Sequence, residues 1–311
     1  MTKKLISLLL VLVLAFSLVA CSKDEEKPAE TATETKTEEK TEEKTEEQAP
    51  EASNEPITVI SREDGSGTRG AFIEITGIEE KDGDTKVDRT TVDAVVQKST
   101  NAVLMTVNGD KNAIGYISLG SLNDSVKAAK VEGVEASSDN VLDGSYKIAR
   151  PFNIVYKGEA DGLKKDFIDF MMSKEGQEMV LENKYVQVDT AAAEYKQNSQ
   201  SGKLVVGGST SVTPLMEKFA EKYMEMYPDV KIEIQSTGSS AGIQAAIEGA
   251  ADLGMASRDL SDEEKAELTN VVIAKDGIAV IVNNDNAIDD LSLDQIKAIF
   301  VGETKTWGDI K

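Results

Sequence analysis

Hydrophobic runs alternate with amphipathic stretches along residues 57–311. Short apolar runs that end at glycine, serine or proline predict strands, and longer stretches with apolar residues three or four positions apart predict helices. We expect strands at residues 57–61, 113–119, 151–157, 203–208, 230–235 and 271–284. We expect helices from about residue 68 and at residues 162–183, 214–228, 241–250 and 292–302.

This alternation of strands and helices predicts an α/β fold with helices on both faces of the sheet. The helix expected at 214–228 shows the pattern clearly, because Pro214 suits a first helical turn and Leu215, Phe219 and Tyr223 recur every four residues. The expected folded part, residues 57–311, contains 255 residues. That length is sufficient for two lobes, each with its own core.

Residues 1–20 have the pattern of a signal peptide. A positively charged start, "MTKK", precedes an apolar run of 16 residues, which is short for a membrane span. The run ends at "LVAC", and its cysteine, Cys21, is the only one in the chain. Small residues before a cysteine at this place resemble the bacterial lipobox. The resemblance implies cleavage before Cys21 and lipidation of its thiol; the alternative is a signal anchor with an incidental cysteine.

Residues 21–56 have no large apolar side chain, and the motif "KTEE" recurs in them. Such a segment buries too little surface to offset its chain entropy, so we expect a disordered tether. A flexible chain of this length spans roughly 30–35 Å on average. The tether would hold the folded part away from a membrane or extend it through a wall layer.

Composition excludes several classes of function. The formal net charge of −22 argues against a nucleic-acid partner, which requires a basic surface. One cysteine and no histidine exclude a disulfide framework, a Cys/His zinc site and a His-based catalytic triad. We also expect no metal, no cofactor and no enzyme activity.

Three segments share one design: each leaves a strand and enters a helix through glycine and hydroxyl residues. They are "SREDGSGTRG" (61–70), "GGSTSVTP" (207–214) and "STGSSAG" (236–242). The N-terminus of a helix has unpaired N–H groups and a positive dipole end, which suit an oxyanion. Glycine allows the backbone to approach closely, and serine and threonine add neutral donors. Together the loops predict a small tetrahedral anion held mainly by dipoles.

Two other motifs in these loops point to different chemistry. Gly65, Gly67 and Gly70 fit the G-x-G-x-x-G pattern of dinucleotide sites, but the second strand and acidic residue that the pattern requires are replaced by a loop-like stretch, residues 79–90. "GSSAG" fits a nucleophile elbow around Ser240, but the chain has no histidine to act as its base. The lysine of a P-loop is also absent. These alternatives are weaker than anion binding.

The segments "SREDGSGTRGAF", "GGSTSVTPLMEKF", "STGSSAGIQAAIEGAADLGMASRDL" and "DLSLDQIKAIFVGETKTWGDI" closely resemble the phosphate-binding lipoproteins of bacterial phosphate ABC importers. The resemblance covers nearly all of residues 57–311. It implies the two-lobed periplasmic-binding-protein fold (type II), with inorganic phosphate held in the cleft between the lobes.

The order of the motifs differs from the family. The family places its GGSTS-type loop first and its GSGT loop about a hundred residues later, whereas here residues 61–70 precede residues 207–214. This order suggests a circular permutation, in which residues 186–202 join the family's old ends. The competing interpretation is a truncated tandem repeat that completes its site in a swapped dimer.

The resemblance also implies the ligands of the phosphate. Arg62 matches the family's arginine, and Asp64 lies where the family pairs an aspartate with it. The other matches are hydroxyl or N–H donors: Ser66, Gly67, Thr68, Ser211, Val212 and Ser239, with Thr210 as an alternative to Ser211.

One position departs from the family pattern. Many relatives have an aspartate after the "GAS" turn, which accepts the proton of phosphate and so excludes sulfate. Here Ser257 occupies that position, and Arg258 and Asp259 follow it. Selectivity for phosphate over sulfate is therefore open, and Asp259 or Asp64 would have to supply the acceptor.

We expect a membrane-tethered phosphate receptor that delivers phosphate to the permease subunits of an ABC importer. The lobes should be residues 57–149 plus 279–311 and residues 150–278, with crossings at 148–157 and 276–284. We expect a monomer, lipid-anchored outside the cytoplasm of a Gram-positive-like bacterium. The alternatives are a binder of sulfate, molybdate or tungstate, or a surface sensor or adhesion module with the same fold.

Overall fold

The computed structural model describes residues 54–83 and 85–310. The signal peptide, Cys21 and most of the tether, all expected in residues 1–53, lie outside the described residues. Among the residues described, no helix is both long enough and apolar enough to cross a membrane.

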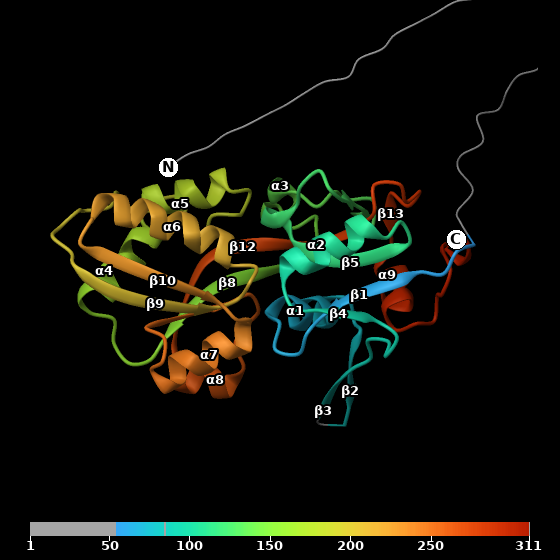
Figure 1. Ribbon diagram of the computed structural model, residues 1–311, viewed down its shortest axis with the longest axis horizontal. Helices are drawn as coiled ribbons and strands as arrows, with labels where there is room; N and C mark the ends of the chain where they lie inside the picture. The colour runs from blue at the N-terminus through green and yellow to red at the C-terminus, as the bar shows by residue number, and fades with distance from the viewer. Residues whose placement is uncertain (1–53, 84, 311) are drawn as a thin grey trace, which may run out of the picture. The chain divides into compact units, whose positions relative to one another are not determined.

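One large sheet organises the described part of the chain (Figure 1). Its strands, in spatial order, are β10 (Val230–Ser236), β9 (Gly202–Gly208), β11 (Leu253–Ala256), β8 (Ala149–Tyr156), β12 (Thr269–Val282), β5 (Ala113–Ser118), β1 (Thr58–Arg62) and β4 (Val95–Gln97), and β6 (Lys127–Ala128) also pairs with β12. β9 pairs with β10 and β11 in parallel, and β1 pairs with β5 and β4 in parallel. β8 pairs with β12 and with β11, and both of these pairs are antiparallel. The sequence-based expectation of an α/β fold is therefore confirmed.

β12 links two sets of elements. Its residues 269–277 pair with β8, and its residues 278–282 pair with β5. The register shifts between Val272 and Ala274, so a bulge lies within the part that pairs with β8. A single strand thus runs from one part of the sheet to the other, which Figure 1 shows between the labels β8 and β5.

Two hydrophobic cores lie on either side of this link. One contains Phe152, Phe167, Phe219 and Met255, and it is covered by α4 (Gly162–Met172), α5 (Lys174–Glu182) and α6 (Thr213–Met226). The other contains Phe72, Tyr116, Phe300 and Trp307, with α1 (Gly67–Ile75) and α9 (Leu293–Phe300). A further cluster beside the second core packs α2 (Thr100–Gly109) on β5. These cores explain why the apolar stripes fall where they do along the sequence.

The remaining elements are small. They are the helices α3 (Ser138–Leu142), α7 (Ser239–Glu248) and α8 (Asp262–Glu267), the 3₁₀ turns η1 (Leu119–Ser121) and η2 (Trp307–Asp309), and the strands β2 (Glu79–Asp82), β3 (Thr85–Asp88), β7 (Lys130–Val131) and β13 (Asp290–Leu291). β2 and β3 form an antiparallel hairpin, so the expectation of a loop at residues 79–90 is wrong. Alternating charged residues concealed this hairpin, because its strands have almost no buried face.

The helix expected at 162–183 is in fact two helices, α4 and α5, which meet at Ser173. The Ser173 hydroxyl donates to the carbonyl of Phe170 and accepts from the N–H of Gly176, so it ends one helix and caps the next. A Cβ on Gly176 would lie 2.3 Å from the carbonyl oxygen of Phe170, and glycine is therefore required at this corner. The amphipathic period continues across the corner, which is why the sequence predicts one helix.

The first and last described segments lie side by side. The N–H of Ile57 donates to the carbonyl of Lys305 at 2.8 Å, and Pro56 forms a β-bridge with Thr306. The N–H of Trp307 reaches the carbonyl of Glu55 at 3.3 Å. The start of the folded part is therefore held against the segment that follows α9.

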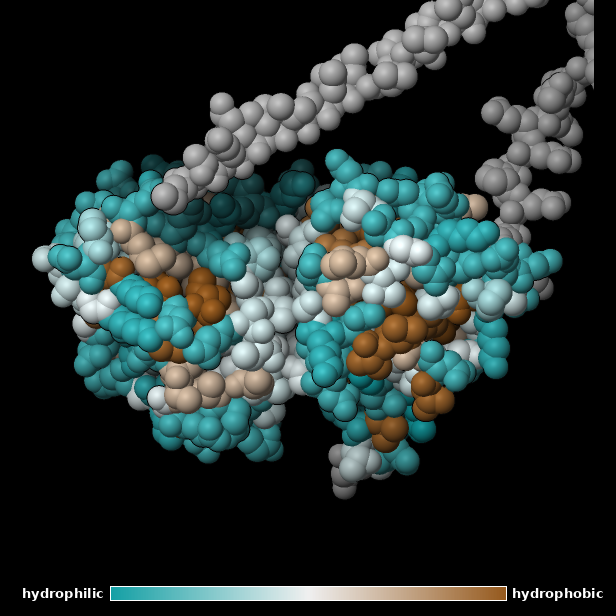
Figure 2. All heavy atoms as spheres, viewed as in Figure 1, coloured by the Kyte–Doolittle hydropathy of each residue, from teal (hydrophilic) through white to brown (hydrophobic). Residues whose placement is uncertain are grey.

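The surface is mostly polar, with apolar side chains gathered in a few places on the face shown in Figure 2. The exposed large hydrophobic residues include Val92, Val95 and Val96, which belong to the edge strand β4 and the turn before it. β4 pairs with β1, the strand that leads into the first of the three glycine and hydroxyl loops.

Candidate anion-binding site

The three glycine and hydroxyl loops each join a strand to the N-terminus of a helix, as the sequence predicts. The loops follow β1, β9 and β10 and lead into α1, α6 and α7. Ser66 caps α1 by accepting the N–H of Arg69 at 3.4 Å, and Gly238, with φ of 97°, precedes the first turn of α7. All three loops turn their hydroxyl groups toward the same place.

Seven buried or half-buried hydroxyl residues meet there, and we call them the hydroxyl cluster: Thr68, Thr100, Ser209, Thr210, Ser211, Ser239 and Ser257. At one end the Ser211 hydroxyl lies 2.8 Å from that of Thr68 and 3.1 Å from that of Thr100. At the other end the Ser209 hydroxyl donates to that of Ser257 at 2.9 Å, and the N–H of Ser257 donates to the Ser239 hydroxyl at 3.1 Å. The cluster therefore spans both sets of elements that β12 links.

Gly67 marks the closest approach between these parts. A Cβ on this residue would lie 2.4 Å from the hydroxyl oxygen of Ser239 and 2.7 Å from that of Ser257. Only glycine leaves room for these two hydroxyl groups next to the first turn of α1. Nearby, the N–H of Ser240 donates to the carbonyl of Gly65 at 3.0 Å, which adds a backbone contact between the same two loops.

Arg62 is the cation at one end of the cluster, and its side chain is only 2% exposed. Its Nη2 donates to the Thr210 hydroxyl at 3.1 Å. Its Nε and Nη2 also bind the two carboxylate oxygens of Glu63 at 2.8 and 2.9 Å, and Nε donates to the carbonyl of Gln97 at 3.3 Å. The guanidinium group is thus fixed in orientation beside the hydroxyl groups.

The acidic partner of Arg62 is Glu63, and the expectation that Asp64 pairs with it is wrong. The side chain of Asp64 is 99% exposed and forms an ion pair with Arg69 at 3.2 Å. The chain turns at Asp64 and Gly65, and the Asp64 side chain faces solvent there. The sequence motif cannot tell which of the two acids turns toward the arginine.

Ser257, Arg258 and Asp259 also differ in burial. Ser257 is fully buried in the hydroxyl cluster, whereas Asp259 is exposed. Arg258 is partly exposed, binds Glu264 at 2.7 Å, and donates to the Ser240 hydroxyl at 3.3 Å. The two carboxylates expected as proton acceptors, Asp64 and Asp259, therefore both face solvent, which argues against that role.

The loop before α6 uses its backbone differently from the family-based expectation. The N–H groups of Ser211 and Val212 point to the Ser209 hydroxyl at 3.2 and 3.4 Å, and that of Val212 also reaches the carbonyl of Ser209. Ser209 thereby accepts from the N–H groups at the start of α6, and its own hydroxyl donates a hydrogen bond to the Ser257 hydroxyl. The N–H of Val212 is therefore directed to Ser209 in this structure.

Sequence reasoning missed several residues of the site. Thr100 opens α2 after the short strand β4, so it belongs to a fourth strand-to-helix loop with the same hydroxyl signal. Arg150 gives no such signal, because it stands alone before Pro151 in β8. In the structure its Nη1 donates to the carbonyl of Ser257 at 3.0 Å and to the hydroxyl at 3.3 Å.

A buried ion pair supports Arg150. Its Nη2 and Nε bind Asp276 of β12 at 3.0 and 3.3 Å, and both side chains are at most 1% exposed. Burial raises the pKa of Asp276 to about 6, although Arg150 and the Ser118 hydroxyl oppose this shift. Burial also lowers the pKa of Arg150 against the opposing effect of Asp276. The pair lies where β12 passes from β8 to β5.

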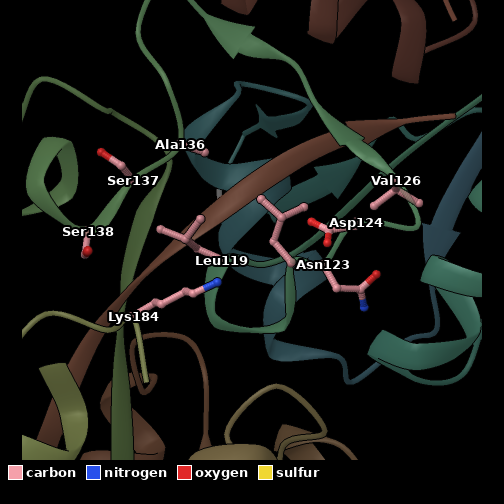
Figure 3. Close-up of a pocket in the computed structure, with 9 residues that line it drawn as sticks. Leu119, Asn123, Asp124, Val126, Ala136, Ser137, Ser138 and Lys184 are labelled. Carbon is pink, nitrogen blue, oxygen red and sulfur yellow. The ribbon is translucent and has the colours of Figure 1, made fainter. Parts of the chain in front are cut away.

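Other features do not compete with the hydroxyl cluster as a ligand site. Within residues 54–83 and 85–310, no group of three acidic, histidine or cysteine residues is placed to hold a metal ion. A surface groove of about 510 Å³ lies beside η1, where Lys184 extends next to Leu119 (Figure 3). Its lining includes Asn123, Asp124 and Ser138, and it shares no residue with the cluster.

Comparison with known proteins gives a consistent result. The model of the PBP superfamily domain matches residues 34–175 and 193–310. Phosphate-binding protein PstS 2 of Streptococcus pneumoniae serotype 4 is 49% identical over 261 residues, which are 84% of this chain and 90% of the relative. The protein of the same name from Streptococcus agalactiae serotype V is 51% identical over 263 residues, 83% of this chain and 89% of the relative.

A solved structure agrees with these relatives. The phosphate-binding protein of a phosphate ABC transporter from S. pneumoniae TIGR4 aligns with a TM-score of 0.68 and 55% identity, covering 83% of this chain and all of that one. The likeness confirms the two-lobed fold expected from the sequence. The chain therefore belongs to the PBP superfamily and, within it, to the PstS phosphate-binding proteins.

Proposed function

We propose that the protein binds inorganic phosphate outside the cytoplasm and delivers it to an ABC importer. The observation that carries this proposal is the hydroxyl cluster, in which three helix N-termini and the buried Arg62 converge. Helix N-termini and fixed hydroxyl dipoles stabilise a tetrahedral oxyanion without many full charges. The names of the PstS relatives support phosphate as that anion.

The proposed ligands follow from this geometry. Arg62 supplies the positive charge, and the loop after β1 supplies Ser66, Gly67 and Thr68. Ser211, Ser239 and Ser257 supply hydroxyl groups from the opposite side, with Val212 behind them and Thr210 and Arg258 in support. The site binds its ligand and performs no reaction on it, because these groups are donors that hold an anion in place.

The remaining parts of the proposal rest on the sequence pattern and the family. The signal peptide and Cys21 suggest a lipid anchor on the outer face of the membrane of a Gram-positive-like bacterium, and residues 21–56 suggest a tether. Permease subunits are the expected partners. We infer that one chain carries the whole site and acts as a monomer, since all the loops of the cluster come from it.

A circular permutation explains the order of the loops, with lobes at residues 57–149 plus 279–311 and 150–278. Two observations support it: Ile57 pairs with Lys305, and residues 186–202 pass along α4 and α5, where the N–H of Lys174 donates to the carbonyl of Ala193. The match to the S. pneumoniae relative runs in chain order over 90% of that protein. This suggests that the order is shared by such relatives rather than produced by truncation of this chain.

Arg62→Ala tests the assignment of the site. The substitution removes a buried, charge-assisted contact to the anion and should cost about 2–5 kcal/mol of binding free energy, or roughly 30-fold to several-thousand-fold in affinity. Asp64→Asn is the matched control, because this exposed carboxylate pairs with Arg69 and should change the affinity less than about threefold. Isothermal titration with phosphate measures both; an Arg62→Ala protein that binds like wild type would refute the assignment.

One observation favours a second candidate, a receptor for another oxyanion. Ser257 replaces the aspartate expected to accept the phosphate proton, and Asp64 and Asp259 face solvent. Titration of the wild-type protein with phosphate, sulfate and molybdate separates the two candidates. Much tighter binding of phosphate supports the proposed function, and equal or tighter binding of sulfate or molybdate supports the second candidate.

A further inference from the structure

Ser257 has neighbours that determine the direction of its hydroxyl hydrogen bonds. The Ser209 hydroxyl accepts the N–H groups of Ser211 and Val212, so its own proton is directed to the Ser257 oxygen at 2.9 Å. Nη1 of Arg150 donates to the same oxygen at 3.3 Å. An arginine has donors only, and a hydroxyl oxygen has two lone pairs. Both lone pairs of Ser257 are therefore engaged, and its proton is left to point elsewhere.

The proton of Ser257 is directed toward the Ser239 hydroxyl and the centre of the cluster. The Ser239 oxygen also accepts the N–H of Ser257 at 3.1 Å, and its distance of 3.4 Å from the Ser257 oxygen is long for a bond between two hydroxyl groups. Gly67 closes the opposite side, where an added Cβ would lie 2.7 Å from the Ser257 oxygen. A bound anion would sit among these groups and offer an acceptor.

Several contacts hold the Arg150 guanidinium group in the orientation in which it donates to the Ser257 hydroxyl. Asp276 binds its Nη2 and Nε, the carbonyl of Ser257 binds its Nη1, and the ring of Phe152 lies 5.4 Å from its guanidinium carbon. Asp276 is held in turn by the hydroxyl of Ser118 at 2.9 Å. Ser118 lies at the end of β5 and binds Oδ1 of Asp276, whereas Arg150 binds Oδ2.

We propose that Arg150 is a positioning residue that fixes the Ser257 hydroxyl as a donor to the bound anion. The inference rests on the proposed function and deepens it. This corner of the site then offers only donors, so it binds an unprotonated oxygen of the anion. It cannot accept the proton of phosphate, which must be directed to another side of the site.

The experiment is a double-mutant cycle on phosphate affinity, measured by isothermal titration. Arg150→Met alone would leave Asp276 buried without its partner, so the cycle replaces the pair together as Arg150→Met/Asp276→Asn. Its corners are wild type, this double variant, Ser257→Ala and the triple variant. The control is Ser118→Ala, which perturbs the same carboxylate from the side away from Ser257.

If Arg150 acts through Ser257, Ser257→Ala lowers phosphate affinity about tenfold or more in the wild-type background, as expected for a lost hydrogen bond to a charged ligand. In the double-variant background the same change lowers it less than about threefold, because the hydroxyl is no longer aligned. In the Ser118→Ala background the full loss remains. Equal losses in all three backgrounds would show that Arg150 has only a structural role.

A second variant covers the case in which the double variant does not fold. Arg150→Lys keeps the charge beside Asp276 and keeps a donor near Ser257. It should bind phosphate within about threefold of wild type, and a loss of more than about tenfold overturns the inference. A wild-type protein that binds no phosphate refutes the proposed function and this inference together, whereas phosphate binding with additive losses refutes the inference alone.

Discussion

Two buried carboxylates are stabilised in different ways. Asp276, at the link between the two cores, is paired with the cation Arg150. Asp166, in α4, instead receives neutral donors: the hydroxyls of Tyr195 and Tyr223 and the amide of Asn198. Burial raises the pKa of both tyrosines, which keeps their protons available for donation.

The difference matches the tasks of the two regions. The Asp166 group ties residues 186–202 to the core, because Tyr195 and Asn198 belong to that segment and Tyr223 belongs to α6. Neutral donors suffice there, since the carboxylate only has to hold a loop. Asp276 instead pairs with Arg150, which reaches Ser257 of the hydroxyl cluster. Under the proposed function, this buried charge pair lies where it can affect binding.

The largest expected effect comes from breaking the charged pair. Arg150→Met leaves the carboxylate of Asp276 buried without its cation and should lower the free energy of unfolding by about 3–5 kcal/mol. Urea denaturation monitored by circular dichroism measures the loss. Adding Asp276→Asn should restore a large part of it, because the uncompensated charge is then gone. A single variant as stable as wild type would show that the pair contributes nothing to the fold.

A smaller effect should appear in the pH dependence of stability. Since burial raises the pKa of Asp276 from 3.8 to about 6, the folded state takes up this proton more readily than the unfolded state. Its contribution to stability is therefore full below pH 3.8 and is lost as the pH rises through about 6. The stability of wild type relative to Asp276→Asn should fall by roughly 1–3 kcal/mol over this window. Denaturation at several pH values tests this; parallel curves would contradict it.

The smallest effect concerns the neutral donors around Asp166. Tyr223→Phe removes a hydroxyl that donates to the carboxylate at 2.5 Å but keeps the ring, and it should cost roughly 1–2 kcal/mol of stability. Tyr146→Phe is a matched control, because its buried hydroxyl donates at 2.8 Å to a neutral carbonyl, that of Ile278. Phosphate affinity should not change in either variant. An effect of Tyr223→Phe smaller than that of the control would mean that the carboxylate gains nothing from its tyrosines.

The sequence predicts the parts of this protein that depend on local pattern. Apolar periodicity locates the main strands and helices, and glycine with hydroxyl residues at strand-to-helix junctions locates the loops of the hydroxyl cluster. The family resemblance is confirmed, and the proposal of phosphate as the anion rests on it. The local pattern predicts where a loop lies, but it does not predict the direction in which each side chain of the loop points.

The missed features depend on contacts between distant residues. Glu63 rather than Asp64 turns toward Arg62, whose guanidinium also contacts Gln97 and Thr210, two residues far away in the sequence. Arg150 and Asp276 are 126 residues apart, so no motif contains both. The β2–β3 hairpin was missed for another reason, since it lacks the buried face that periodicity detects.

The continuity of β12 has a consequence for how the molecule loses its structure. The first part of β12 belongs to one core and the second part belongs to the other. If either core unfolds, β12 loses hydrogen-bond partners, although the other core still requires this strand. Separate domains joined by a flexible linker melt independently, whereas elements that share a strand are energetically coupled. The two lobes should therefore behave as one cooperative unit in unfolding, even though each has a core of its own.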